Sequence, residues 1–190
     1  MISDALVFLK NQLNGYLTVG ADPAESQEEI VVFAEEQNSE GTNFRTESIS
    51  ILLINVEEDN TFRTPNQFVR KAANGDHQTI TPELCLNLQI LLVSRFQRYQ
   101  TSLSYLSKII QYFQKYRAFN DQNASLLPDN IQKLVVELAP LSISTQNEIW
   151  SILRTAYQPS VSYKVKMVVF ETKDPQSTIP IQTTEVEFLK

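Results

Sequence analysis

The segment between Leu84 and Phe119 constrains the fold of this chain more than any other segment does. In it, the longest apolar strand expected in the chain runs almost directly into the longest amphipathic helix. Alternate residues from Leu86 to Leu92 are apolar, which is the pattern of a strand with one buried face. From about Arg98 the apolar period becomes helical. The helical stripe consists of Tyr99, Leu103, Leu106, Ile110 and Phe113, widened by Ile109 and Tyr116. We expect this strand and this helix to form the core.

Shorter segments on both sides supply the remaining elements. Residues 2–17 carry apolar side chains at helical spacing with Ser3 placed to cap them, and Ser144 is placed to cap a second, short helix. The stretch Glu40–Asn43 indicates a turn. Strands are expected at 30–34, 48–56, 134–138, 161–169 and 183–188. This order predicts an α+β fold with a mixed, largely antiparallel sheet of about five to six strands, flanked by an N-terminal helix, one long central helix and a shorter helix.

The strand at 48–56 is apolar on both faces, which is typical of a central strand. Simple alternation places Leu52, Ile54 and Val56 on one face of it. The acidic triplet Glu57, Glu58 and Asp59 follows directly. Neighbouring carboxylates can perform acid–base chemistry, but consecutive carboxylates at a strand end more often form a solvated edge. We therefore keep a catalytic role for the triplet only as an alternative.

The length of 190 residues suits a single domain spanning 1–190. The region 60–82 shows no periodicity and is expected to be a mobile segment, whereas 172–190 contains two prolines and is expected to be an extended arm. The net charge of −6 argues against a nucleic-acid partner. No apolar run is long enough to span a bilayer, so direct membrane insertion is not expected. The single cysteine, Cys85, excludes an internal disulfide and agrees with a cytoplasmic protein.

The residues that most enzymes need are scarce in this sequence. Only four glycines are present, and neither GxGxxG nor GxxxxGK[ST] occurs. The single histidine, His77, has no second histidine or cysteine at the spacing of metal ligands. We therefore expect no catalytic residue, no cofactor and no metal site, and a non-enzyme is favoured.

Five segments, taken in order, carry a family resemblance. They are LVFLKNQLNGYL at 6–17, ILLINVEED at 51–59, LNLQILLVSRFQRYQTSLSYLSKIIQYFQ at 86–114, the Ile149–Trp150 helix and PSVSYKVKMV at 159–168. Together they resemble the N-terminal domain of the tail-terminator, or cap, proteins of phage-tail-like extracellular contractile injection systems. The signature residues are Asn87, Phe113, Gln114, Trp150, Pro159, Ser160 and Tyr163, which we expect to maintain the fold.

The resemblance implies a structural role. Terminators of this kind form a ring, expected to be a hexamer, that caps the distal end of the sheath and inner tube and stops their polymerisation. The chain itself and the sheath and inner-tube subunits are the implied partners. Assembly is expected in the cytoplasm, and the chain then stays in the particle, which is released or membrane-anchored.

The contacts with partners are expected in the 60–82 segment, at the acidic strand end and in the C-terminal arm, and a mixed sheet offers unpaired strand edges to which neighbours can add. The candidate interface residues are Glu57, Glu58, Asp59, Phe62, Arg63, Phe68, Arg70, Lys71, Val186 and Phe188. Two alternatives remain open: a baseplate or tail-completion adaptor of the same particle, and a small ligand-binding domain or enzyme that uses the Glu57 and Glu58 carboxylates.

Overall fold

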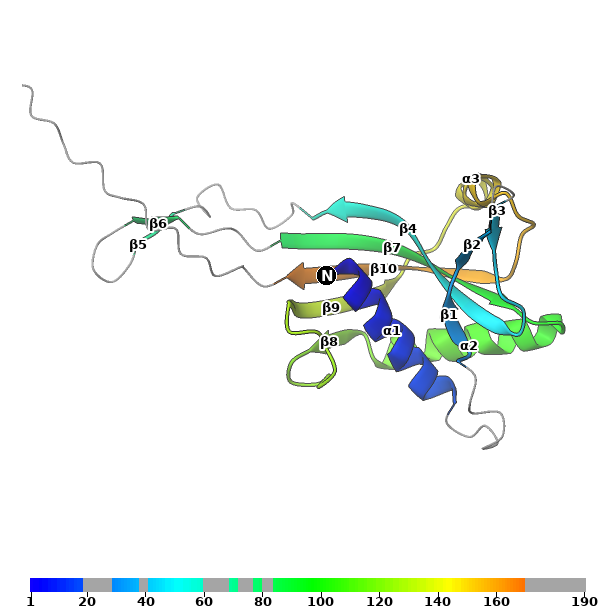
Figure 1. Ribbon diagram of the computed structural model, residues 1–190, viewed down its shortest axis with the longest axis horizontal. Helices are drawn as coiled ribbons and strands as arrows, with labels where there is room; N and C mark the ends of the chain where they lie inside the picture. The colour runs from blue at the N-terminus through cyan, green and yellow to red at the C-terminus, as the bar shows by residue number, and fades with distance from the viewer. Residues whose placement is uncertain (19–28, 38–40, 60–68, 72–76, 80–83, 170–190) are drawn as a thin grey trace, which may run out of the picture.

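The computed structural model describes residues 1–18, 29–37, 41–59, 69–71, 77–79 and 84–169. Its main body is a six-stranded sheet in the order β1-β4-β7-β10-β9-β8 (Figure 1). The strands are β1 (Val31–Phe33), β4 (Ser48–Glu58), β7 (Leu84–Arg95), β10 (Ser160–Val169), β9 (Ile131–Leu138) and β8 (Ala118–Asn120). Only β1 and β4 pair in parallel, and the other neighbouring pairs are antiparallel. The expected α+β fold with a mixed, largely antiparallel sheet is confirmed.

Two short antiparallel pairs stand apart from this sheet. They are β2 (Glu35–Gln37) with β3 (Gly41–Asn43), and β5 (Val69–Lys71) with β6 (His77–Thr79). The turn expected at 40–43 is therefore wrong, because residues 41–43 form a strand that pairs with β2. Within the region expected to be mobile, 69–71 and 77–79 pair as strands. The strand expected at 183–188 and the arm at 172–190 lie outside the described residues.

Two helices cover one face of the sheet, α1 (Ile2–Leu17) and α2 (Tyr99–Lys115). The extent of α1 confirms the periodicity of 2–17, but Ser3 is not its cap, since the helix already begins at Ile2 after Met1. The strand at Leu86–Leu92 turns its apolar side chains to these helices as expected: Leu88, Ile90 and Leu92 are buried in the core between the sheet and the helices.

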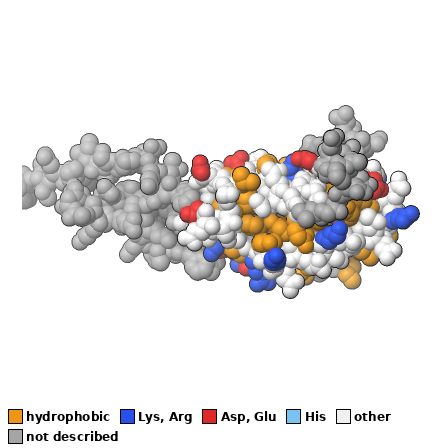
Figure 2. Space-filling view, turned by 90° about the horizontal axis from the view of Figure 1, so that it is seen from below, with side chains coloured by type: hydrophobic (Ala, Val, Ile, Leu, Met, Phe, Trp, Pro, Cys, Tyr) orange, Lys and Arg blue, Asp and Glu red, His pale blue; other side chains and the backbone are white. Residues whose placement is uncertain are grey.

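The buried face of α2 differs from the stripe expected from its sequence. Leu106 and Phe113 are buried, but Tyr99 is 65% exposed, Leu103 43% and Ile110 39%. Ile109 and Tyr112 are buried, and the Tyr112 hydroxyl donates to Gln12 Oε1 of α1 at 3.1 Å. The buried face of α2 is therefore rotated toward α1. The reason is that α1 lies beside α2 and covers a side of it that would be exposed if α2 lay alone on the sheet. Figure 2, seen from the side of α1 and α2, shows the apolar side chains that remain at this surface.

The third helix, α3 (Ile143–Leu153), covers part of the opposite face (Figure 1). Its cap is Ser142 rather than Ser144, since Ser142 Oγ accepts the Thr145 N–H at 3.1 Å. A second, smaller apolar cluster lies under this helix and consists of Phe44, Leu91, Val93, Ile149 and Trp150. Because α3 covers only part of this face, none of the described helices covers the polar half of the sheet beyond it, which we call the uncovered face.

A β-bulge in β4 decides which side chains reach that uncovered half. The pairing of β4 with β7 shifts between Leu53 and Asn55, so one extra residue interrupts the alternation. Val56 consequently lies opposite Leu88 on the helix-covered face, and not with Leu52 and Ile54 as simple alternation predicts. The same shift moves Glu57 to the uncovered face.

Candidate functional site

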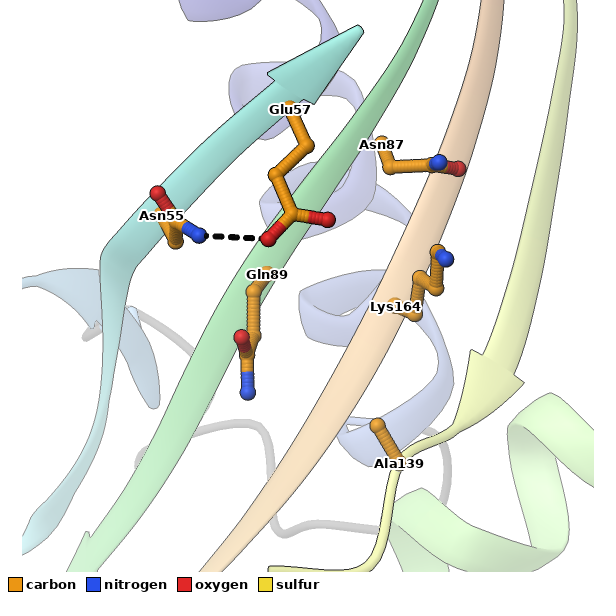
Figure 3. Close-up of a pocket in the computed structure, with 6 residues that line it drawn as sticks. All are labelled: Asn55, Glu57, Asn87, Gln89, Ala139 and Lys164. Atoms are coloured by element: carbon orange, nitrogen blue, oxygen red, sulfur yellow. Dashed lines mark hydrogen bonds between the residues drawn. The ribbon is translucent and has the colours of Figure 1, made fainter. Parts of the chain in front are cut away.

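A polar hollow of about 140 Å³ lies on the uncovered face, across the three central strands (Figure 3). It is lined by Asn55 and Glu57 of β4, Asn87 and Gln89 of β7, Lys164 of β10 and Ala139. The register explains the cluster, because Glu57 lies opposite Asn87, and Gln89 lies between Asn55 and Lys164. Such cross-strand neighbours share a face and contact one another.

The hollow combines hydrogen-bond acceptors with one cation. Asn55 Nδ2 donates to Glu57 Oε1 at 2.9 Å. Asn87 is only 8% exposed, and its Oδ1 has no hydrogen-bond partner among the described atoms. Buried polar atoms usually have a partner. The hollow therefore suits contact with another polar surface, such as a polypeptide that supplies donors.

The acidic triplet does not form a carboxylate pair. Glu57 lies opposite Asn87 and Glu58 opposite Leu86, so the two side chains leave opposite faces of β4. Asp59 follows the strand, and its N–H donates to the Cys85 carbonyl at 2.8 Å. No group of three or more potential metal ligands is found within the described ranges. The arrangement offers one carboxylate within a hydrogen-bonding surface and no acid–base pair.

Sequence reasoning named Glu57 and Asn87 but missed their neighbours Asn55, Gln89 and Lys164. A signal for them exists, since Asn87 and Gln89 interrupt one face of an otherwise apolar central strand, and Lys164 falls on the polar face of its own strand. What the signal lacks is the register that aligns the three strands.

Three signature residues, Phe113, Gln114 and Tyr163, meet at a second hollow between α2 and the sheet. Trp150 instead belongs to the cluster under α3, with its ring 5.9 Å from that of Phe44. The Pro159 carbonyl accepts the Ser94 N–H at 2.9 Å, at the beginning of β10. Trp150 and Pro159 thus make contacts within the fold, and the fold-maintaining role of the signature residues stays a prediction.

The outer edge of β1 is occupied by an asparagine of α1. Asn14 Oδ1 accepts the Val31 N–H at 2.8 Å, and Asn14 Nδ2 donates to the Val31 carbonyl at 2.9 Å. The Ile30 carbonyl and the Ala34 N–H turn to β4, so Val31 turns outward by the alternation of a strand. At this residue Asn14 takes the place of a further strand.

The opposite edge, β8, is occupied in the same manner. Asn123 Oδ1 accepts the Asn120 N–H at 2.9 Å, and Asn123 Nδ2 donates to the Ala118 carbonyl at 3.0 Å. The Arg117 carbonyl faces β9, which leaves Ala118 and Asn120 facing outward. The expectation of unpaired strand edges is therefore wrong at Val31, Ala118 and Asn120, because a side-chain amide offers the same donor and acceptor as a strand.

Of the remaining candidate interface residues, Arg70 and Lys71 lie in β5, where the structure describes only the backbone. Phe62, Arg63, Phe68, Val186 and Phe188 lie outside the described residues. None of the described helices is long and apolar enough to cross a bilayer.

Two solved structures are similar to this chain, and the first of them has the same fold. The PVC sheath/tube terminator of an extracellular contractile injection system, in its extended state, superposes with a TM-score of 0.58 at 14% identity, over 100% of this chain and 63% of that chain. The tube-terminating cap of the anti-feeding prophage gives a TM-score of 0.45 at 13% identity, over 73% of this chain and 49% of that chain. This chain thus spans less than two thirds of the length of either neighbour.

No curated protein sequence matches the chain. The model of the Pvc16 N-terminal domain family matches residues 6–184. This match agrees with the resemblance indicated by the ordered sequence motifs. Because it spans nearly the whole sequence, the chain belongs to the Pvc16 N-terminal domain family.

Proposed function

We propose that this chain is a structural, non-catalytic tail terminator, which caps the distal end of the sheath and inner tube of a contractile injection system and stops their polymerisation. The observation that carries the proposal is the family match over residues 6–184. The whole-chain similarity in fold to a sheath/tube terminator supports it. The chain assembles in the cytoplasm and then remains part of the particle.

The capping unit is a ring, which we take to be a hexamer. A head-to-tail ring needs two different, complementary surfaces on each subunit, and closure of the rotation prevents a filament. The uncovered sheet face, which carries Glu57, Asn87 and Lys164, is suited to be one of these surfaces. The 60–82 segment, the acidic strand end at 57–59 and the C-terminal arm are proposed to contribute the contacts with partner subunits.

The edges occupied by Asn14 and Asn123 bear on how such a ring is held together. A neighbour that adds a strand to β1 or β8 must first displace a side chain that already makes two hydrogen bonds. Contacts through faces and through the ends of strands meet no such obstacle. We therefore assign the ring contacts to faces and strand ends.

The alternatives lose support for different reasons. The enzyme that uses Glu57 and Glu58 requires carboxylates that act together, but their side chains leave opposite faces of β4. A baseplate or tail-completion adaptor is not better supported, because the whole-chain similarity in fold is to a sheath/tube terminator. Its position in the particle distinguishes it from a terminator.

Electron microscopy of particles from cells that lack this chain tests the proposal. A terminator predicts overlong, uncapped, unstable or missing sheaths, and a wild-type copy supplied in trans restores uniform length. Replacement of residues 60–80 by a short neutral linker should give a folded protein that no longer caps. Particles of normal length with normal distal ends in the deleted strain contradict the proposal. An effect confined to the baseplate end favours the adaptor.

A further inference from the structure

The second hollow, between α2 and the sheet, has a volume of about 200 Å³. Phe113 and Val136 are buried in its wall, while Ile110 and Leu138 are 39% and 53% exposed at its rim. Small-molecule pockets usually have about 300–1,000 Å³. The hollow is thus sized for one or two side chains of a polypeptide rather than for a larger ligand.

Tyr163 lines this hollow, and its buried hydroxyl has no hydrogen-bond partner among the described residues. Tyr163 is 2% exposed, its ring lies 4.9 Å from that of Phe113, and no described atom makes a hydrogen bond with its hydroxyl. Burial raises the pKa of Tyr163 to about 12, so the phenol keeps its proton at neutral pH and can donate it. An acceptor oxygen from outside would satisfy a group that the fold leaves unpaired.

The rim adds two further donors. Arg117 and Gln114 line the same hollow and are exposed. Within the described part of the chain Arg117 forms no ion pair. The matching occupant therefore carries an apolar side chain with carboxylates beside it.

The chain itself contains a segment of this composition. Residues 185–188 read Glu-Val-Glu-Phe, in which apolar and acidic side chains alternate. In an extended conformation Val186 and Phe188 share one side and the two glutamates share the other. The charge of the glutamates complements Arg117, and the apolar pair matches the rim formed by Ile110 and Leu138.

We propose that the hollow between α2 and β9 receives the Glu185–Phe188 segment of a second copy of this chain. The contact extends the proposed ring by naming one of its subunit junctions. Its test needs no particle, so failure of this contact and failure of the capping function are told apart.

The binding test uses the full chain with its own segment disabled by Val186→Asp and Phe188→Asp. A fluorescent peptide of residues 183–190, TTEVEFLK, is titrated into this protein, and its anisotropy is followed. We expect saturable binding that Arg117→Glu weakens about tenfold through the lost charge pair. Lys108→Glu is the matched control, because it makes the same charge change on α2 away from the hollow and should leave binding unchanged. Tyr163→Phe removes the hydroxyl and leaves the charge of the protein unchanged. It should weaken binding several-fold.

A charge reversal gives the sharper arm of the test. The peptide TTKVKFLK should bind poorly to the disabled chain and regain affinity for its Arg117→Glu variant. Sedimentation of the wild-type chain should show concentration-dependent self-association that Val186→Asp with Phe188→Asp abolishes. Absence of peptide binding, binding equally strong after Arg117→Glu, or a wild-type chain that stays monomeric at all concentrations would each overturn the proposal.

Discussion

The two outer strands of the main sheet are both three residues long and are closed by the same type of side chain, but from different distances along the chain. At β8 the amide of Asn123 reaches back to Asn120 and Ala118 within one turn. At β1 the amide comes from Asn14 of α1, which is 17 positions away from Val31 in the sequence. The first closure forms with its own turn, whereas the second exists only once α1 has packed on the sheet.

The two closures also differ in their access to water. Val31 is fully buried at 0% exposure, whereas Ala118 and Asn120 are partly exposed. A backbone group that loses its partner in a buried place bears the full cost of desolvation, while an exposed group regains hydrogen bonds to water. The same pair of hydrogen bonds should therefore contribute more to stability at the buried edge of β1 than at the exposed edge of β8.

Replacement of Asn14 by alanine should have the largest effect. It leaves the N–H and the carbonyl of the buried Val31 without partners and should lower the free energy of unfolding by about 2–4 kcal/mol. It also exposes the β1 edge, so we expect self-association as well. Urea denaturation and size-exclusion chromatography measure the two effects. Asn11→Ala, at an exposed position on the same helix, is the control. An equal loss of unfolding free energy in this variant would contradict the proposed role of Asn14 at the edge of β1.

Replacement of Asn123 by alanine should have a smaller effect, about 1 kcal/mol. Water can take over the bonds to Asn120 and Ala118, and the Asn120 carbonyl keeps the Ala124 N–H at 3.0 Å. Gln122→Ala alters the same turn without touching the edge and serves as the control. A loss as large as that of Asn14→Ala, measured by the same denaturation, contradicts the argument from burial.

High pH should weaken the docking of α1, with an effect similar in size to that of Asn123→Ala. Burial raises the pKa of Tyr112 to about 12, while an unfolded tyrosine has a pKa near 10.0. The folded state therefore favours the protonated phenol, and this stability is complete below pH 10 and is lost as the pH rises from about 10 to 12. At pH 11 the loss from Tyr112 should be about 1 kcal/mol.

Denaturation of the wild type and of Tyr112→Phe at pH 8 and pH 11 measures this effect. The variant cannot ionise at this position, so its stability should fall less between the two pH values, by about the stated amount. Tyr99→Phe is the control, since Tyr99 is 65% exposed on the same helix. Equal pH dependence in the wild type and in Tyr112→Phe would mean that ionisation of Tyr112 does not contribute to the loss of stability at high pH.

Parts of the candidate site could be predicted from the sequence. Glu57 and Asn87 stand out, one in an acidic triplet and the other as a polar residue within an apolar strand. Their contact could not be predicted, because the bulge between Leu53 and Asn55 decides which face Glu57 joins. A bulge depends on the pairing with the partner strand, so it cannot be predicted from the sequence of one strand alone.

The elements that depend on local side-chain patterns could be predicted from the sequence. Alternation from Leu86 to Leu92 and the helical period after Arg98 fixed β7 and α2, because side-chain spacing alone decides which residues share a face. Ordered motifs along the whole chain likewise sufficed to indicate the family. Tertiary structure alone decided the rotation of α2 toward α1, the closure of β1 by Asn14 and the gathering of Phe113, Gln114 and Tyr163 at one hollow. Each of these depends on contacts between segments far apart in sequence, which local propensity and periodicity do not specify.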